Sequence, residues 1–179
     1  MKQLVTLKDV KEHPTVKKYI KKADNFLGVI GYTEHGERHA NRVSKTAMTV
    51  LKELGMSKRT IILGSIAGYL HDIGNVINRV HHAQTGAIIA HSILTTMGMS
   101  VEDIAEIIGA IGNHHEDDGS PVSNVAAALI LADKSDVHRS RVRNPAFIKF
   151  DIHDRVNYAT TKSVLEVNKE EKKNNTKVI

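Results

Sequence analysis

The chain has 179 residues, of which 41% are hydrophobic and 25% charged, and these proportions suit one globular domain with an aliphatic core. It contains no cysteine, which excludes disulfide bonds and means that any metal ion must be held by His, Asp or Glu. The formal net charge of +5 fits an anionic small substrate. We interpret the lysines near both ends as solvated surfaces and do not expect a nucleic-acid partner.

No segment of the sequence has the features of a secretory signal or a membrane span. The chain reaches Lys8 and Asp9 without the apolar run that a signal needs. The longest wholly apolar stretch, residues 125–132, is far shorter than the ~20 residues that cross a bilayer. We therefore expect a soluble cytoplasmic protein with no membrane partner.

Apolar residues recur at three- and four-residue steps along most of the chain, which predicts an all-α fold. In chain order we expect helices over residues 14–28, 37–54, 58–73, 83–97, 101–113, 122–136 and 151–165. Ser57 and Ser100 are suited to cap two of these helices, and Gly74 is expected to end the third in a left-handed conformation. On the helix over residues 83–97 we expect the buried side to carry Ala87, Ile88, His91 and Leu94.

Strand signals appear only in the tail of the chain. Residues 163–167 and 176–179 flank a turn rich in Lys, Glu and Asn, and they could pair as a short β-hairpin. We accordingly divide the chain into a helical domain over residues 1–160 and a tail over residues 161–179. The last residue, Ile179, is compatible with a natural end or with one piece of a longer protein.

Histidine and aspartate residues occur at five places beside the apolar faces of these helices. They are His39, the doublet His71-Asp72, the doublet His81-His82, the doublet His114-His115, and Asp133. A buried carboxylate needs a partner, because isolated burial of a charge costs several kcal/mol. The basic neighbour of Asp133, Lys134, is expected to point elsewhere on its helix. A divalent cation bound by carboxylates and neutral imidazoles from several helices would satisfy both aspartates, whereas single histidines would usually cap or pack individually.

The ordered set of these residues resembles the HD superfamily of metal-dependent phosphohydrolases, which is named for its His-Asp doublet. The local strings that carry the resemblance are residues 39–43, 70–74, 82–87, 113–116 and 131–134. The resemblance extends over roughly residues 31–143. The five strings in this order are a specific signal of the family, whereas one string alone would be a weak signal. It implies an all-helical domain of the HD type.

The resemblance also implies the roles of the site residues. A first metal would be held by His39, His71, Asp72 and Asp133, and a second by His82 and His114 with Asp72 bridging. In members with this set the centre is usually binuclear and often holds iron or manganese; Mg, Ni or Zn are alternatives. Two cations would neutralise charge on the phosphoryl group and generate hydroxide near neutral pH. Asp72 would position that hydroxide, and a nearby histidine, which we take to be His115, would protonate the leaving oxygen.

Three histidines leave alternatives open. His115 could be a ligand of a third metal, or it could hydrogen-bond beside the ligands, which we favour because it is turned about 100° from His114. The four-residue spacing to Gly86 favours His82 over His81. His35 could add a ligand, but we expect it to face solvent. Residues 117–121 lack the Gly-Tyr-Pro string of members that hydrolyse cyclic di-GMP, so that specificity is not implied.

Cationic residues near the expected ligands are candidates for binding a substrate phosphate. Arg42 lies one turn from His39, Lys134 adjoins Asp133, and Arg143 belongs to a downstream group of arginines. A guanidinium group suits bidentate phosphate contacts, although such residues could equally be surface charges.

The leading hypothesis is metal-dependent hydrolysis of a phosphomonoester or phosphodiester, in a nucleotide or a related small molecule. One alternative is a catalytically silent regulatory module that binds metal and nucleotide without turnover. A basic nucleic-acid-binding helical protein is a third class, and the sequence shows no recognised DNA-binding motif for it. The exact substrate and the native metal stay open, and a homo-oligomer is compatible with the sequence.

Overall fold

The computed structural model of the protein describes residues 4–117, 119–143, 152–168 and 173–178. Its α-helices are α1 (Leu7–Glu12), α2 (Pro14–Val29), α3 (Glu37–Glu53), α4 (Lys58–Leu70), α5 (His82–Thr96), α6 (Val101–Gly112), α7 (Asn124–Lys134) and α8 (Ile152–Ala159). Two short 3₁₀ helices, η1 (Ile73–Val76) and η2 (Arg139–Arg141), follow α4 and α7. The strands β1 (Ser163–Asn168) and β2 (Lys173–Val178) form an antiparallel hairpin. The predicted all-α fold with a short C-terminal hairpin is confirmed.

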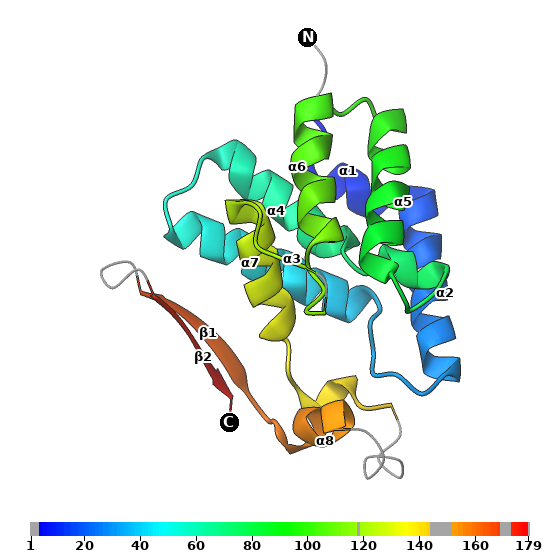
Figure 1. The fold of residues 1–179 in the computed structure, drawn as a ribbon, viewed down its shortest axis with the longest axis vertical. Coiled ribbons are helices and arrows are strands. Elements are labelled where there is room, and N and C mark those ends of the chain that lie inside the picture. The colour runs from blue at the N-terminus through cyan, green and yellow to red at the C-terminus, as the bar shows by residue number, and fades with distance from the viewer. Residues whose placement is uncertain (1–3, 118, 144–151, 169–172, 179) are drawn as a thin grey trace.

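Helix α4 lies at the centre of the helical domain. Every residue from Leu63 to Leu70 is buried, and α4 packs against α1, α3, α6 and α7. Helix α5 pairs with α6, and η1 contacts both α2 and α5. Figure 1 shows this bundle with the hairpin extending away from it beside α7. Because the last two turns of α4 are covered on all sides, the residues that follow the helix enter the interior of the domain.

The predicted helix starts agree with the capping side chains. The hydroxyl oxygens of Ser57 and Ser100 accept hydrogen bonds from backbone N–H groups three residues later, as expected. The helix predicted over residues 151–165 is too long at its end, because α8 stops at Ala159 and Ser163 already begins β1. The chain leaves the helix where the carbonyl of Thr160 accepts a hydrogen bond from the N–H of Arg139 (3.0 Å). Residues 151 and 179, the outer bounds expected for this helix and for the hairpin, lie outside the described residues.

The buried face of α5 differs from the prediction. Ile88 is 71% exposed and His91 is also exposed, whereas the buried side carries Ala83, Gly86, Ala90, Ile93 and Leu94. A Cβ atom at Gly86 would lie 3.2 Å from the carbonyl oxygen of His71, so α5 approaches the end of α4 very closely. Small side chains permit this approach, and they decide which face turns inward.

Gly74 does not adopt the left-handed conformation expected for it. Among the described residues, the glycines with positive φ are Gly31, Gly55 and Gly98, and Gly74 lies within η1. A Cβ atom at position 74 would lie 2.0 Å from the carbonyl oxygen of His82 and 2.5 Å from the N atom of Gly86. The glycine is therefore required by close packing of η1 on α5, which brings the end of α4 beside the start of α5.

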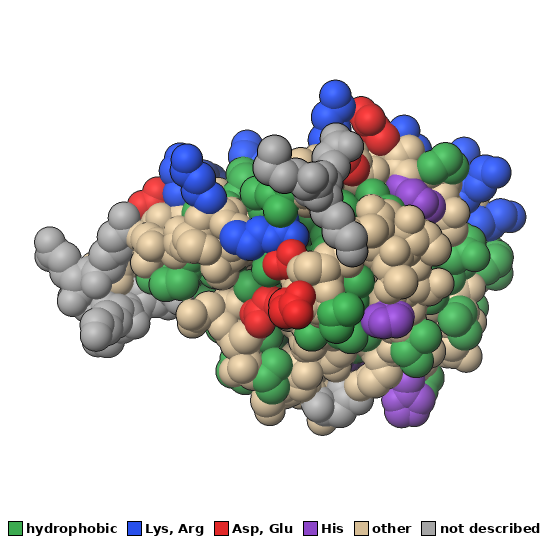
Figure 2. Space-filling model, turned by 90° about the horizontal axis from the view of Figure 1, so that it is seen from above, with side chains coloured by type: hydrophobic (Ala, Val, Ile, Leu, Met, Phe, Trp, Pro, Cys, Tyr) green, Lys and Arg blue, Asp and Glu red, His purple; other side chains and the backbone are tan. Residues whose placement is uncertain are grey.

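The basic residues of α2 lie on the surface. Lys17, Lys18, Lys21 and Lys22 are all exposed. In Figure 2, Lys and Arg side chains lie along the upper and right margin and also within the face beside acidic side chains, and they form no continuous patch. No helix formed by the described residues is long and apolar enough to cross a membrane.

We expect the substitution Gly74→Ala to destabilise the protein by about 1–3 kcal/mol, because the added methyl group must displace the backbone of α5. The matched control is Gly109→Ala in α6, where a Cβ atom would meet nothing within 4 Å. That change should leave the stability unchanged or raise it by up to about 1 kcal/mol, since alanine is the better helix former. Urea denaturation of both variants measures the difference, and equal midpoints would contradict the packing argument.

Candidate metal centre

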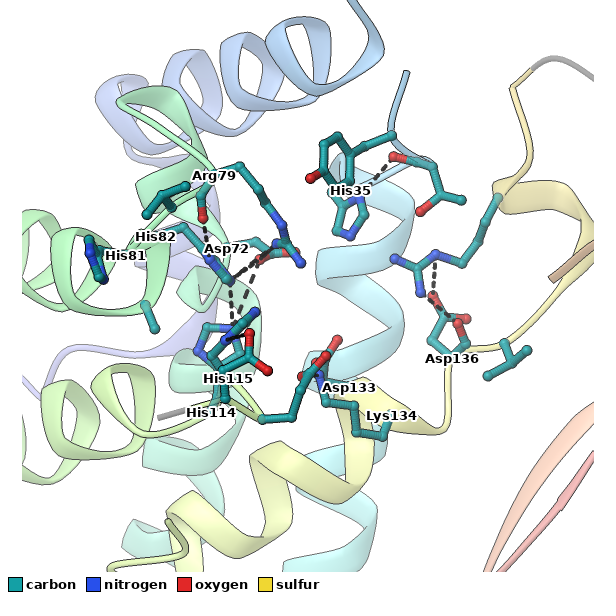
Figure 3. A pocket seen from close by; sticks show the side chains of 18 of the residues that line it. His35, Asp72, Arg79, His81, His82, His114, His115, Asp133, Lys134 and Asp136 are labelled. Atoms are coloured by element: carbon teal, nitrogen blue, oxygen red, sulfur yellow. Dashed lines mark hydrogen bonds and ion pairs between the residues drawn. The ribbon is translucent and has the colours of Figure 1, made fainter. Parts of the chain in front are cut away.

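Six of the predicted site residues lie together at the ends of five helices. His39 lies in the first turn of α3, His71 and Asp72 follow α4, His82 begins α5, His114 follows α6, and Asp133 lies in the last turn of α7. Potential ligand atoms of these residues form overlapping groups within 4.8 Å of one another. The four histidine residues are no more than 2% exposed. Figure 3 shows Asp72, His82, His114 and Asp133 converging at the base of one cavity.

One half of the cluster is formed by His39, His71 and Asp133. The Nε2 atoms of the two histidines are 3.2 Å apart. The Oδ1 atom of Asp133 lies 3.2 Å from Nε2 of His39 and 3.5 Å from Nε2 of His71. The Oδ2 atom of Asp72 completes this half, at 3.2 Å from Nε2 of His71 and 3.6 Å from Nε2 of His39.

The other half is formed by His82 and His114. Their Nε2 atoms are again 3.2 Å apart. The second carboxylate oxygen of Asp72, Oδ1, lies 3.4 Å from Nε2 of His82 and 4.0 Å from Nε2 of His114. The carboxylate of Asp72 thus stands between two pairs of imidazoles and turns one oxygen toward each pair.

The outer nitrogen of each histidine is fixed by a hydrogen bond that leaves Nε2 directed at the cluster. The Nδ1 atoms of His71, His82 and His114 lie 2.7–2.9 Å from the backbone carbonyl oxygens of the residues three positions earlier, Gly68, Arg79 and Ile111. A carbonyl oxygen only accepts, so the proton of the neutral ring is on Nδ1. The lone pairs on Nε2 are therefore available as metal ligands.

The electrostatics of the cluster favour a positive charge between the carboxylates. Burial raises the pKa of Asp72 and of Asp133, but the neighbouring imidazoles outweigh it and hold both pKa values well below the usual range. His71 has this effect on Asp72, and hydrogen bonds with His39 and His71 have it on Asp133. Burial lowers the pKa of His71, yet the two carboxylates raise it to about 10. Burial lowers the pKa of His82 to about 4 and that of His114 to about 3, so both rings are neutral at pH 7.

The donor set fits divalent metal ions. The Oδ2 atom of Asp72 is buried and has no hydrogen-bond partner within the described part of the chain, which is costly for a charged oxygen. His82 and His114, both neutral, have Nε2 atoms only 3.2 Å apart, and a cation bound by both would stabilise this arrangement. Imidazole and carboxylate donors together suit Mn, Fe, Ni and Zn.

A cavity of about 950 Å³ opens above the cluster. Its lining includes Tyr32, His35, Arg79, His115, Lys134 and Arg141. The Nζ atom of Lys134 lies 3.0 Å from Oδ2 of Asp133, and Lys134 also contacts Glu116. The expectation that Lys134 points away from Asp133 is therefore wrong, because the long side chain folds back across the helix end.

The three other histidines that were considered as possible ligands take different positions. His115 is partly exposed at the cavity wall, and its ring meets the ring of His82 edge to face at 5.0 Å. His81 is exposed and has a left-handed conformation (φ 57°), whereas His82 enters the cluster. We expected His35 to face solvent, but it is half-buried in the wall of the cavity. Its Nδ1 atom lies 2.7 Å from the carbonyl oxygen of Thr33, and burial lowers its pKa to about 3.

Two of the predicted phosphate-binding arginines do not line the cavity. Arg42 donates a hydrogen bond to the carbonyl oxygen of Ser163 at the start of β1 (3.3 Å). Arg143 donates to the carbonyl oxygen of Tyr32 (3.0 Å) and also contacts Asp24. Both side chains connect distant segments of the backbone. Of the three candidates, Lys134 alone is placed at the cavity.

Sequence reasoning missed three residues that contact the cluster. The Oδ2 atom of Asp136 lies 2.7 Å from Nδ1 of His39. The side-chain amide of Asn75 donates a hydrogen bond to Oδ1 of Asp72 (2.9 Å). Arg79 approaches His82 with its Nη1 atom at 3.2 Å. Each stands three residues from a candidate ligand, and this one-turn spacing was the available signal.

Comparisons with known proteins identify related sequences and folds. A family model described as HD domain matches residues 36–137, more than half of the chain. An uncharacterized protein of Methanocaldococcus jannaschii is 29% identical over an alignment of 164 positions, and the match covers 74% of this chain. The chain spans only 62% of the length of that relative. A crystal structure of a predicted HD superfamily hydrolase from an uncultured Thermotogales bacterium has a TM-score of 0.56 and 26% identity, covering 69% of this chain and 67% of that one.

We expect Asp136→Asn to weaken metal binding by about 10–100-fold, because the carboxylate orients His39 and strengthens its Nε2 as a donor. Titration calorimetry with Mn²⁺ measures the change. The control is Asp117→Asn, which alters a carboxylate whose side chain is 84% exposed at the cavity rim. Equal affinities in the two variants would show that Asp136 does not support the cluster.

Proposed function

Because the chain belongs to the HD domain family, we propose that it is a metal-dependent phosphohydrolase with a binuclear His/Asp centre. The substrate class that we propose is a phosphomonoester or phosphodiester of a nucleotide or a related small molecule. The Thermotogales structure, which is described as a predicted HD superfamily hydrolase, supports the same class of activity.

The observation that carries this proposal is the position of Asp72 between the two imidazole pairs. One carboxylate oxygen lies 3.2 Å from Nε2 of His71, and the other lies 3.4 Å from Nε2 of His82. A carboxylate placed in this way can bridge two cations. His39, His71 and Asp133 would hold the first ion, and His82 and His114 the second. When bound, two such ions neutralise charge on a phosphoryl group and lower the pKa of a water molecule.

The residues around the cluster provide the remaining functions of a phosphohydrolase. Lys134 places an ammonium group at the cavity beside Asp133, where it would bind a phosphate oxygen. His115 lies at the cavity wall beside His82 and would donate a proton to the leaving oxygen. The buried helix ends below the cavity keep bulk water away from one side of the reacting group.

The size of the cavity supports a small-molecule substrate. Its volume of about 950 Å³ lies within the range of ~300–1,000 Å³ that is usual for ligand pockets. Tyr32 and Val80 give its lining apolar and aromatic surface, and Arg79, Lys134 and Arg141 add positive charge. This combination suits a molecule with a phosphate group and a less polar remainder, as in a nucleotide.

We expect the purified protein supplied with Mn²⁺ or Fe²⁺ to release phosphate or nucleoside from at least one member of a nucleotide panel. Asp72→Ala and Asp72→Asn should each lower the rate by at least about a hundredfold, because both remove the bridging charge. Glu102→Ala, which removes an exposed carboxylate in the first turn of α6, should retain the full rate.

Metal analysis and circular dichroism accompany the assay. Full activity of a folded Asp72→Ala variant would refute the proposed mechanism. Stoichiometric metal and bound nucleotide without product across the whole panel would instead favour a regulatory module.

A further inference from the structure

The side chain of Arg79 occupies an unusual position above the cluster. It belongs to the short segment between η1 and α5, and only 24% of its side chain is exposed. The guanidinium lies over the ring of Tyr32, with 5.5 Å between Cζ and the ring centroid. In Figure 3 the guanidinium reaches down from the segment above the cavity toward Asp72 and His82. A cationic group is thus placed directly at a proposed metal position.

The contact between Arg79 and His82 fixes the direction of the hydrogen bond. The Nη1 atom of Arg79 is 3.2 Å from Nε2 of His82. The Nδ1 atom of the same ring is 2.9 Å from the carbonyl oxygen of Arg79. A guanidinium only donates and a carbonyl only accepts, so the ring carries its proton on Nδ1 and its lone pair on Nε2. That lone pair is the acceptor for Arg79.

The same lone pair is the one that a metal ion would need. An imidazole nitrogen has a single lone pair, which cannot accept an N–H bond and coordinate an ion at the same time. Nη1 of Arg79 also lies 3.9 Å from Oδ1 of Asp72, the oxygen that faces the His82–His114 pair. The guanidinium therefore supplies positive charge to two of the three groups that would bind the second ion, His82 and Asp72.

No comparable contact exists in the other half of the cluster, as far as the described residues show. On that side Arg38 binds Asp136 (3.0 Å) and Arg141 lies 4.0 Å from the same carboxylate, and neither contacts an Nε2 atom in the described part of the chain. Lys134 binds Oδ2 of Asp133, whereas Oδ1 of Asp133 faces His39 and His71. The Nε2 atoms of His39 and His71 face each other and carboxylate oxygens instead of an arginine.

We propose that Arg79 competes with the second metal ion for Nε2 of His82 and Oδ1 of Asp72, an inference that rests on the proposed function. The two halves of the centre therefore differ in affinity. The ion held by His39, His71 and Asp133 is the tightly bound one, and the ion held by His82 and His114 enters only as the guanidinium withdraws. Occupancy of the second position then follows the concentration of free divalent metal, so Arg79 sets the metal concentration at which the binuclear centre forms.

The test is a calorimetric titration of the full chain with Mn²⁺. The variant Arg79→Met keeps the length of the side chain and removes its charge and its donors. The variant His114→Ala assigns the binding event of the second position, because that event should disappear from its titration. The matched control is Arg139→Met, since Arg139 also lies over a tyrosine ring, that of Tyr158 at 5.9 Å, but does not line the cavity.

We expect Arg79→Met to tighten the second event by about tenfold or more and to leave the first event unchanged, because a hydrogen bond from a charged donor no longer competes. Electron paramagnetic resonance should show the spin-coupled pair of Mn²⁺ ions at lower metal concentration in this variant. An unchanged or weaker second event in Arg79→Met would overturn the competition. Equal tightening in Arg139→Met would also overturn it, because the effect would then be one of net charge.

The same experiment separates this inference from the proposed function. If neither the unsubstituted protein nor Arg79→Met binds Mn²⁺, the metal centre itself is wrong. If the unsubstituted protein and Arg79→Met both bind two ions with the same affinities, the metal centre is supported and the competition by Arg79 is refuted. Unfolding temperatures of all variants, recorded without metal, show whether a change in binding reflects the site or a loss of folded protein.

Discussion

The buried charge of Asp72 is the constraint on which the arrangement of this domain depends. The residue follows a helix that is covered on every side, so its carboxylate enters an interior where an uncompensated charge costs several kcal/mol. Asn75 donates one hydrogen bond to it, and the remaining compensation must come from the imidazoles and from cations. Helices α3, α5, α6 and α7 each bring an imidazole or a carboxylate to this point, and the close packing of η1 on α5 at Gly74 places the start of α5 beside the end of α4.

Three of the histidines are oriented by the same kind of hydrogen bond. In His71, His82 and His114, Nδ1 lies against the carbonyl oxygen of the residue three positions earlier. For His71 and His114 that carbonyl belongs to the last turn of a helix, where backbone carbonyls lack partners within the helix. One hydrogen bond thus satisfies the helix end and fixes the ring. His39, at the start of its helix, has no such carbonyl and uses Asp136 instead.

Much of the fold could be predicted from the sequence because helical periodicity and serine caps are local signals. The six candidate ligands were recognisable for the same reason, since each stands beside an apolar helical stripe. The buried face of α5 was not predictable, because small residues at a close helix contact outweighed the larger Ile88. Arg42 and Arg143 were also misplaced as phosphate-binding groups, since their partners are carbonyl oxygens of segments distant in sequence. Contacts of this kind depend on the assembled fold.

The distribution of the candidate ligands over α3, α4, α5, α6 and α7 has a consequence for how the protein folds. No two neighbouring helices contain the whole set, so an unfolded chain offers a metal ion at most a few weak donors. Closing the long loop between positions 39 and 133 is an entropic cost that must be met before the centre exists. An ion that binds only after this closure stabilises the native state by mass action and ties the helices together like a crosslink. Such a crosslink could suppress fraying at five helix ends at once, which a bond between any two helices could not do.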